Sequence, residues 1–253
     1  MCLLIIASHA HPRYPLIIAA NRDEVFNRPT AAAHYWDDHP GILAGRDLDR
    51  GGTWMAVDRL GRVAAVTNYR DRSAPRPGLS SRGSLVTGYL TGTQSAAKYL
   101  ADVAGRVSDY NSFNLCAGDS GSIWVISSAD PRPRRLPRGV HGISNGSLDV
   151  PWPKVERGRQ ALQTLLEEDA VDVARIFGFL QDREVPVESQ PPAGPAAESW
   201  AVPVFVSGAD YGTRCSTVLL AGLDGSIQYH ETGYDRNGME TNRTAYSFTV
   251  MGS

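Results

Sequence analysis

Two consecutive apolar segments open the chain and restrict its fold more than any other feature of the sequence. Residues 2–8 (Cys-Leu-Leu-Ile-Ile-Ala-Ser) and 15–20 (Pro-Leu-Ile-Ile-Ala-Ala) are rich in β-forming residues, and a polar turn that contains Pro12 separates them. This pattern predicts two paired strands. Because neither segment alternates apolar with polar residues, both strands should be buried on both faces. The chain therefore begins with a sheet that is covered on its two sides.

The rest of the chain alternates between blocks of predicted strands and blocks of predicted helices. Helices are expected over 84–107, 154–168 and 170–181, a surface loop over 185–198, and further strands over 52–58, 62–69, 114–118, 122–127, 202–207, 215–223, 226–231 and 245–250. Hairpins separated by helical blocks favour an α+β fold with antiparallel sheets and helices layered outside them. No internal repeat or boundary divides residues 1–253, so we expect one domain.

Composition excludes several classes of protein. The net charge of −2 and the lack of any Lys/Arg block argue against a nucleic-acid binder that works by bulk charge. The longest apolar runs have the length of strands, so we expect no membrane span. Met1 is followed directly by apolar residues without a basic segment, which argues against a signal peptide and for a cytoplasmic protein. An odd number of cysteines, three, fits reduced thiols better than a disulfide framework.

Most motifs of established chemistry are missing. The sequence has no phosphate-binding loop, dinucleotide-binding fingerprint, His-Glu-x-x-His segment or Gly-x-Ser-x-Gly elbow. His9 and His11 would face the same side of an extended segment and could ligate a metal, but a polar strand end beside Pro12 is the simpler interpretation. We therefore predict neither a metal nor a resident cofactor.

Cys2 is the residue with a direct route to chemistry. If Met1 is removed, the thiol of Cys2 and a free α-amine belong to one residue. Such an amine has an ordinary pKa of about 7.7–8.0, which allows it to act as a general base toward its own side chain. The alternative is that Cys2 is a small buried apolar residue at the start of the first strand, a common role for free cysteine.

A polar segment, Ala-Asn-Arg-Asp-Glu over residues 20–24, ends the second apolar strand. Polar residues at a strand end usually form turns and caps. Paired strands lie about 5 Å apart, however, so a suitable register would bring this segment to the start of the first strand. Asp23 would then be able to hold or orient the α-amine of Cys2.

These residues resemble the NRDE-motif proteins, also called the transport and Golgi organization family. The resemblance implies an Ntn-hydrolase-type αββα sandwich with two antiparallel sheets, and it links the chain to haem trafficking and to lipid or acyl-CoA metabolism. It extends over nearly the whole chain, in Met1-Cys2, residues 20–29, Leu43-Ala-Gly-Arg-Asp47, Gly51-Gly-Thr-Trp54, Val66-Thr-Asn-Tyr-Arg70, Ser81-Arg-Gly83, Tyr110-Asn-Ser-Phe-Asn-Leu115, His141-Gly-Ile-Ser-Asn-Gly146, Pro151-Trp-Pro-Lys-Val155 and Tyr211-Gly-Thr-Arg-Cys-Ser-Thr217.

A more distant resemblance, to penicillin V acylases and bile-salt hydrolases, implies roles for individual residues. Asp23 is similar to the aspartate that orients the amine in those enzymes, and Asn68 to an asparagine of their oxyanion hole. Asn145 is similar to their second asparagine and Arg214, more loosely, to a late arginine. Those enzymes carry an arginine directly before the Asn-x-Asp segment, where this chain has Ala20.

Two functional hypotheses follow. The first is an N-terminal-cysteine hydrolase or acyltransferase that acts on a small amide or thioester. The second is a non-catalytic protein that binds haem or an acyl lipid such as acyl-CoA, as cargo, in the same pocket. The expected catalytic residues are Cys2, Asp23, Asn68, Asn145 and Arg214, and the expected substrate contacts are Asn21, Arg22, Arg46, Trp54 and Tyr69.

Overall fold

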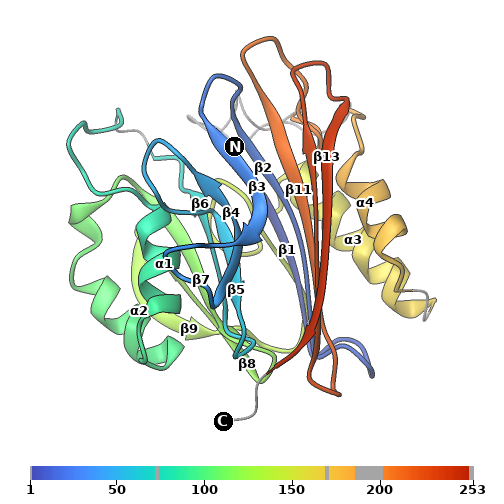
Figure 1. Ribbon diagram of the computed structural model, residues 1–253, viewed down its shortest axis with the longest axis horizontal. Helices are drawn as coiled ribbons and strands as arrows, with labels where there is room; N and C mark the ends of the chain where they lie inside the picture. Colours follow the sequence, from blue (N-terminus) through green and yellow to red (C-terminus); the bar gives the residue numbers. More distant parts are fainter. Residues whose placement is uncertain (1, 72–73, 169–170, 186–201, 251–253) are drawn as a thin grey trace.

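The computed structural model of the protein describes residues 2–71, 74–168, 171–185 and 202–250. These residues form two antiparallel sheets that are stacked face to face, with two α-helices on the outer face of each sheet (Figure 1). The α+β architecture and the order of its layers confirm the prediction made from the sequence.

The first sheet has six strands in the order β10-β1-β2-β11-β12-β13. Every neighbouring pair in it is antiparallel. The N-terminal hairpin supplies two of its inner strands, β1 and β2. The strands are β1 (Leu3–Ser8), β2 (Leu16–Val25), β10 (Gly139–Ile143), β11 (Tyr211–Ala221), β12 (Ser226–Tyr234) and β13 (Glu240–Thr249).

The second sheet has seven strands and follows the order of the chain, from β3 to β9. Each strand pairs antiparallel with the next. The strands are β3 (Thr30–Tyr35), β4 (Ile42–Asp47), β5 (Met55–Asp58), β6 (Val63–Asn68), β7 (Phe113–Asp119), β8 (Ser122–Ser127) and β9 (Asp130–Arg135).

The N-terminal hairpin is buried on both faces, as its continuous apolar sequence predicts. Side chains alternate along β1, so Leu4 and Ile6 enter the core between the two sheets. Leu3 and Ile5 point the other way, into the core beneath the helices of the six-stranded sheet. All four are at most 2% exposed.

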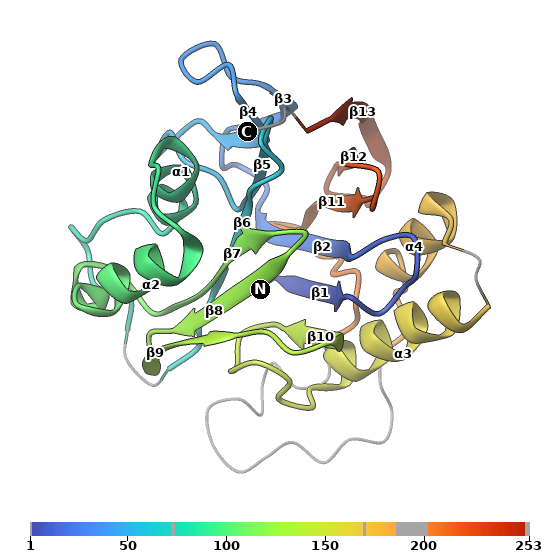
Figure 2. The same cartoon turned by 90° about the horizontal axis from the view of Figure 1, so that it is seen from below.

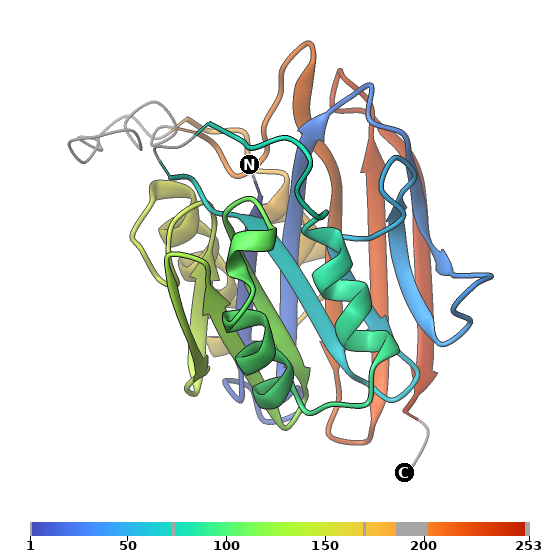
Figure 3. The same ribbon diagram turned by 90° about the vertical axis from the view of Figure 1, so that its left-hand side faces the viewer.

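The helices cover the outer faces of the sheets in pairs. Helices α1 (Gly83–Thr91) and α2 (Ala96–Ala104) pack on the seven-stranded sheet, as Figures 2 and 3 show, and a short 3₁₀ helix, η1 (Val107–Asp109), follows them. Helices α3 (Pro153–Glu167) and α4 (Val173–Leu180) pack on the six-stranded sheet. Both outer layers bury their own apolar cluster against the sheet.

The structure corrects several predicted boundaries. The single helix expected over 84–107 is two helices, because α1 ends before Gly92 and Ser95 caps the start of α2. The strand expected over 202–207 is wrong: this segment is irregular, and its Phe205 N–H donates to Asp182 O at 2.7 Å. Strands β3, β4, β9 and β10 were not predicted. The loop expected over 185–198 lies, except for its first residue, outside the described residues.

None of the helices in the described ranges combines the length and apolar character that are needed to cross a membrane.

Candidate functional site

The pairing of β1 with β2 brings Cys2 to the polar segment at the end of β2. Leu3 lies opposite Asn21 in this pairing, so the register places Cys2, one residue earlier, beside Arg22. Ser144, directly after β10, donates a hydrogen bond from its Oγ to the Cys2 carbonyl at 2.8 Å. Cys2 is thus held between its two neighbouring strands, and its side chain is half-buried.

A cavity of about 220 Å³ lies at this end of the molecule. Cys2, Asp23 and Asn68 all line it, although they come from the start of β1, the end of β2 and the end of β6. Arg22 and Trp54 line it as well. Three of the five predicted catalytic residues and two of the five predicted substrate contacts therefore share one cavity.

Asp23 lies at the base of this arrangement with a completely buried side chain. Thr213 of β11 donates a hydrogen bond to Asp23 Oδ1 at 2.7 Å. The ammonium of Lys154, in the first turn of α3, is 3.8 Å from Asp23 Oδ2 and is also completely buried. Burial raises the pKa of Asp23, and the nearby Lys154 charge opposes that rise. Burial likewise lowers the pKa of Lys154, against the opposing charge of Asp23.

The two asparagines lie next to each other but differ in their surroundings. Asn68 lines the cavity, whereas Asn145 is not part of its wall. The Asn145 amide donates from Nδ2 to the Asn68 carbonyl at 2.9 Å. Thr67 adds a second link to the same segment by donating from Oγ1 to Ser144 O at 2.9 Å. Asn145 therefore holds the end of β6, on which Asn68 stands.

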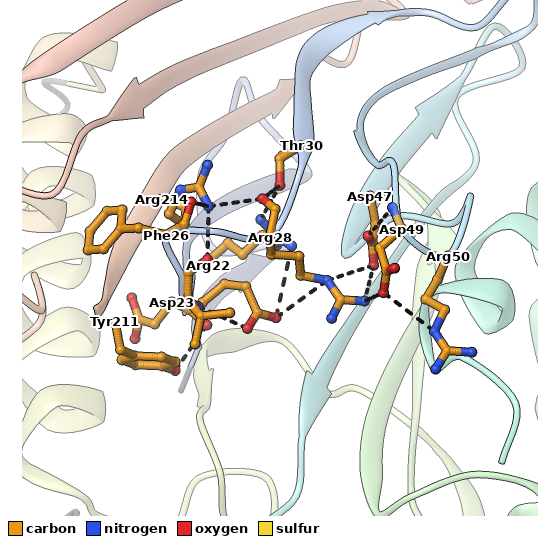
Figure 4. Close-up of polar contacts among 12 residues, drawn as sticks. Arg22, Asp23, Phe26, Arg28, Thr30, Asp47, Asp49, Arg50, Tyr211 and Arg214 are labelled. Carbon is orange, nitrogen blue, oxygen red and sulfur yellow. Dashed lines mark hydrogen bonds and ion pairs between the residues drawn. The ribbon is translucent and has the colours of Figure 1, made fainter. Parts of the chain in front are cut away.

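Arg22 and Trp54 form one wall of the cavity together. The guanidinium carbon of Arg22 lies 4.2 Å from the centre of the Trp54 ring, a cation–π contact. Arg22 also donates from Nη1 to Thr30 Oγ1 at 3.1 Å (Figure 4). With these contacts, Arg22 is only 6% exposed and is fixed in orientation.

A network of ion pairs forms the outer rim of the cavity (Figure 4). Arg28 lies at its centre and donates from Nη2 to Asp47 Oδ2 at 2.6 Å. Its guanidinium also lies 3.9 Å from Glu24 and 3.5 Å from Asp49. Arg50 contacts the same Asp49 carboxylate at 3.5 Å. The rim is therefore strongly polar, which suits a small polar ligand.

Comparison with known proteins identifies the family. A family model described as "Transport and Golgi organisation 2" matches residues 1–236. The chain is 31% identical over 279 residues to the Transport and Golgi organization 2 homolog of Mus musculus, covering 99% of this chain and 100% of that protein. The homolog of Bos taurus is 33% identical over 285 residues with the same coverage.

The chain belongs to the transport and Golgi organisation 2 family.

Solved structures place this family member in a known fold. Its structure is similar to that of a mutant of the conjugated bile acid hydrolase from Clostridium perfringens, with a TM-score of 0.52 over 99% of this chain and 92% of that chain. A second variant of the same enzyme gives 0.53 over 100% and 98%. Sequence identity is 10% in both cases, so the likeness concerns the fold. It confirms the expected Ntn-hydrolase-type αββα sandwich.

In this member of the transport and Golgi organisation 2 family, two predicted substrate contacts point away from the cavity. Asn21 is 1% exposed and donates from Nδ2 to Leu180 O at 2.8 Å, on the side of the sheet that α4 covers. Arg46 forms a two-pronged ion pair with Asp38, at 2.7 and 2.6 Å, and lies over the ring of Trp36. Side chains alternate along a strand, so Arg46 has the orientation opposite to that of its neighbour Asp47, which lines the cavity.

Tyr69 and Arg214 are likewise not part of the cavity wall. Arg214 donates from Nη1 to the backbone carbonyls of Val25, Phe26 and Arg28, at 3.0, 3.0 and 3.1 Å. These three carbonyls belong to the last residue of β2 and to the turn that leads from it to β3. The geometry thus gives Arg214 a structural contact with the turn that precedes the rim, and it brings Arg214 into no contact with the cavity.

The three thiols of this family member have different environments. Cys116 and Cys215 are buried within strands β7 and β11. Burial raises the pKa of Cys116 to about 12 and that of Cys215 well above its ordinary value, which favours the unreactive thiol form. Cys2 is the cysteine that lines the cavity and is partly exposed.

Sequence reasoning missed several residues around the cavity. Lys154, Arg28 and Arg82 were not among the predicted site residues, and the last two line the cavity. A signal for Lys154 exists, because the chain contains only two lysines and this one follows the apolar segment Val-Pro-Trp-Pro. A lysine there must either be exposed or have a buried partner, and Asp23 is that partner.

Proposed function

We propose that this protein is an N-terminal-cysteine hydrolase or acyltransferase that acts on a small amide or thioester once Met1 has been removed. One observation carries the proposal: Cys2, Asp23 and Asn68, from three separated segments, line the same cavity. A reactive thiol, a group that can orient its base and an amide that can donate to an oxyanion are the components that acyl transfer needs.

The reaction would proceed through an acyl-enzyme. The α-amine of Cys2 takes the proton of its own thiol, and the sulfur attacks the substrate carbonyl to form a carbon–sulfur bond. The side-chain amide of Asn68 stabilises the oxyanion of the tetrahedral intermediate. As the intermediate collapses, the amine returns the proton to the leaving nitrogen or sulfur. Water or an acceptor nucleophile then releases the acyl group from Cys2 with the amine again as base.

Asp23 would act on the amine rather than on the substrate. Its carboxylate is anchored by Thr213 and faces Lys154. A buried carboxylate is costly unless a positive charge compensates it, and Lys154 provides that charge. In this account Lys154 keeps Asp23 ionised, and ionised Asp23 orients the amine of Cys2.

The fold of the solved neighbours supports this proposal, since those structures are of a conjugated bile acid hydrolase. The rival is a carrier that binds haem or an acyl lipid in the cavity without covalent chemistry. A cavity of about 220 Å³ suits a small substrate better than either of these much larger molecules.

Labelling with an acylating probe distinguishes an N-terminal-cysteine hydrolase or acyltransferase from a carrier that binds its ligand without covalent chemistry. The protein without Met1 is treated with a small β-lactone, and the modified residue is found by intact mass and peptide mapping. The proposal predicts one acyl group per chain, on Cys2, and none on the Cys2→Ala variant. Cys116→Ala is the matched control and should be labelled like the wild type, because its thiol is buried. Equal labelling of Cys2→Ala, or no labelling of the wild type, would contradict the proposal.

A further inference from the structure

The charges around the cavity do not balance. Among the described residues, four guanidinium groups line it, from Arg22, Arg28, Arg50 and Arg82. The buried charges of Asp23 and Lys154 compensate each other. The remaining carboxylates of the described cavity wall are those of Glu24 and Asp47. These two and the neighbouring Asp49 all lie within 4.0 Å of Arg22, Arg28 or Arg50. Three of these guanidinium groups therefore have a carboxylate partner, and the positive charge without one among the described residues is that of Arg82.

Arg82 is the residue directly before α1, and it is half-buried. It donates from Nη1 to the Ser112 carbonyl at 3.1 Å. In the part of the chain that the structure describes, no carboxylate lies within 4.0 Å of its guanidinium. Burial lowers the pKa of Arg82, and the nearby charges of a Cys2 thiolate and of Glu24 oppose that effect. A guanidinium is charged at every physiological pH, so Arg82 brings an uncompensated cation to the wall beside Cys2.

A close backbone contact fixes the position of Arg82. A Cβ atom on Gly52 would lie 2.7 Å from the carbonyl carbon of Gly83, and one on Gly83 would lie 3.0 Å from the backbone of Thr53. Two glycines thus allow the start of α1 to pack directly on the segment after β4. Because Arg82 precedes Gly83, this contact holds its backbone beside the cavity, and the hydrogen bond to Ser112 O holds its side chain.

We propose that the substrate of this cavity carries a carboxylate, and that Arg82 binds this group while Cys2 attacks the amide or thioester of the same molecule. The inference rests on the proposed function and names its substrate class. A planar guanidinium binds a carboxylate through two parallel hydrogen bonds. The cavity of about 220 Å³ must also hold the acyl group, which favours a carboxylate over the bulkier phosphate.

Two alkylating reagents of nearly equal size test this pairing. Iodoacetate carries a carboxylate and iodoacetamide a neutral amide, and with both the Cys2 thiolate forms a sulfur–carbon bond as iodide leaves with the bonding electron pair. The rate constant of Cys2 in the protein without Met1 is measured by peptide mass spectrometry for each reagent. The ratio of the two rate constants is compared with that of N-acetylcysteine.

We expect the iodoacetate-to-iodoacetamide ratio of Cys2 to exceed that of N-acetylcysteine by about tenfold, the size of a charge-assisted hydrogen bond. Arg82→Gln should bring the ratio back to that of N-acetylcysteine. Arg76→Gln is the matched control, because Arg76 is exposed, close in sequence and absent from the cavity wall, and it should retain the high ratio. Circular dichroism verifies that both variants are folded.

The outcomes separate this inference from the proposed function. If the ratio equals that of N-acetylcysteine while iodoacetamide still modifies Cys2, the carboxylate site is wrong and the proposed function stands. If Arg82→Gln slows both reagents by the same factor, Arg82 acts on the thiolate and the carboxylate site is again wrong. If neither reagent modifies Cys2 in the wild type, the reactive thiol is contradicted, and this inference fails with it.

Discussion

The Nζ atom of Lys154 lies 3.8 Å from Asp23 Oδ2, and both side chains are completely buried. The pair joins two layers of the molecule, because Asp23 stands on β2 and Lys154 in the first turn of α3. A helix on the outer face of the six-stranded sheet thereby supplies a charge to Asp23, a residue of the cavity wall. Each ion stabilises the other, since Lys154 is the charge that most strongly opposes the effect of burial on Asp23, and Asp23 is the charge that most strongly opposes it on Lys154.

The Lys154→Met variant should lose about 3–5 kcal/mol of its free energy of unfolding, the usual cost of removing one partner of a buried ion pair. The loss depends on pH. Burial raises the pKa of Asp23, and the Lys154 ammonium opposes that rise. In the Lys154→Met variant this opposing charge is gone, so the pKa of Asp23 rises further. At pH 5 more Asp23 is therefore protonated than at pH 8, so the loss should be smaller at pH 5. Urea unfolding at the two pH values measures it.

The double variant Lys154→Met with Asp23→Asn is the control for this prediction. With both charges removed, its free energy of unfolding should be higher than that of Lys154→Met alone, because no buried charge remains. Strictly additive losses in the double variant would show that the two groups do not compensate each other.

The contact between Gly52 and Gly83 predicts a steric effect on the start of α1. The methyl group of Gly52→Ala would lie 2.7 Å from the Gly83 backbone, so the helix start must move. We expect a loss of about 1–3 kcal/mol, as for other overpacked sites, and a changed rate of Cys2 alkylation because Arg82 moves too. Gly41→Ala is the matched control, since nothing lies within 4 Å of its added methyl group. Equal stability of the two variants in urea would refute this packing argument.

The contacts of Arg214 predict a structural effect on the β2–β3 turn. Arg214→Met leaves the carbonyls of Val25, Phe26 and Arg28 without this donor, which should cost about 1–3 kcal/mol of stability. Amide hydrogen exchange over residues 26–28 should become faster. If the variant keeps its stability and loses acylation of Cys2, Arg214 has the catalytic role that the distant resemblance implied.

Glu231 predicts a pH dependence of stability from the core between the sheets. The buried carboxyl accepts from the Ala33 N–H at 2.7 Å, and burial raises its pKa from 4.5 to about 7. A raised pKa means that the folded protein favours the protonated carboxyl. The contribution of Glu231 to the free energy of unfolding is therefore complete below pH 4.5 and is lost as the pH rises from 4.5 through 7. Between pH 5 and pH 8 the wild type should lose about 3 kcal/mol relative to Glu231→Gln, by urea unfolding. Parallel pH profiles of the two proteins would contradict the assignment.

The fold could be predicted where local sequence and burial agree. The N-terminal hairpin has unbroken apolar runs, and both of its faces are indeed buried. Strands β3 and β9 were not predicted from the sequence, because they form the two edges of the seven-stranded sheet. Edge strands tolerate residues that central strands exclude, and β9 contains two prolines and three arginines. The irregular segment around Phe205 is apolar because it is buried against the rest of the molecule. From the sequence alone, such a buried irregular segment looks the same as a short buried strand.

The cavity could be predicted in part. The proximity of Cys2 and Asp23 could be predicted, because they lie at adjacent ends of two strands that pair in the N-terminal hairpin. Lys154 and Arg82 stand at the starts of two helices that are distant in sequence, and only the packing of the layers shows that Lys154 contacts Asp23 and that Arg82 lines the cavity. Arg46 was misplaced because strand β4, whose alternation decides the direction of its side chain, was not predicted.

The mass of the intact protein purified from its native cells tests the central claim most directly, because Cys2 has a free α-amine only after Met1 is removed. We predict a mass lower than that of the full sequence by one methionine residue, with Cys2 as the first residue by N-terminal peptide sequencing. A protein that retains Met1 in its native cells would contradict an N-terminal cysteine nucleophile.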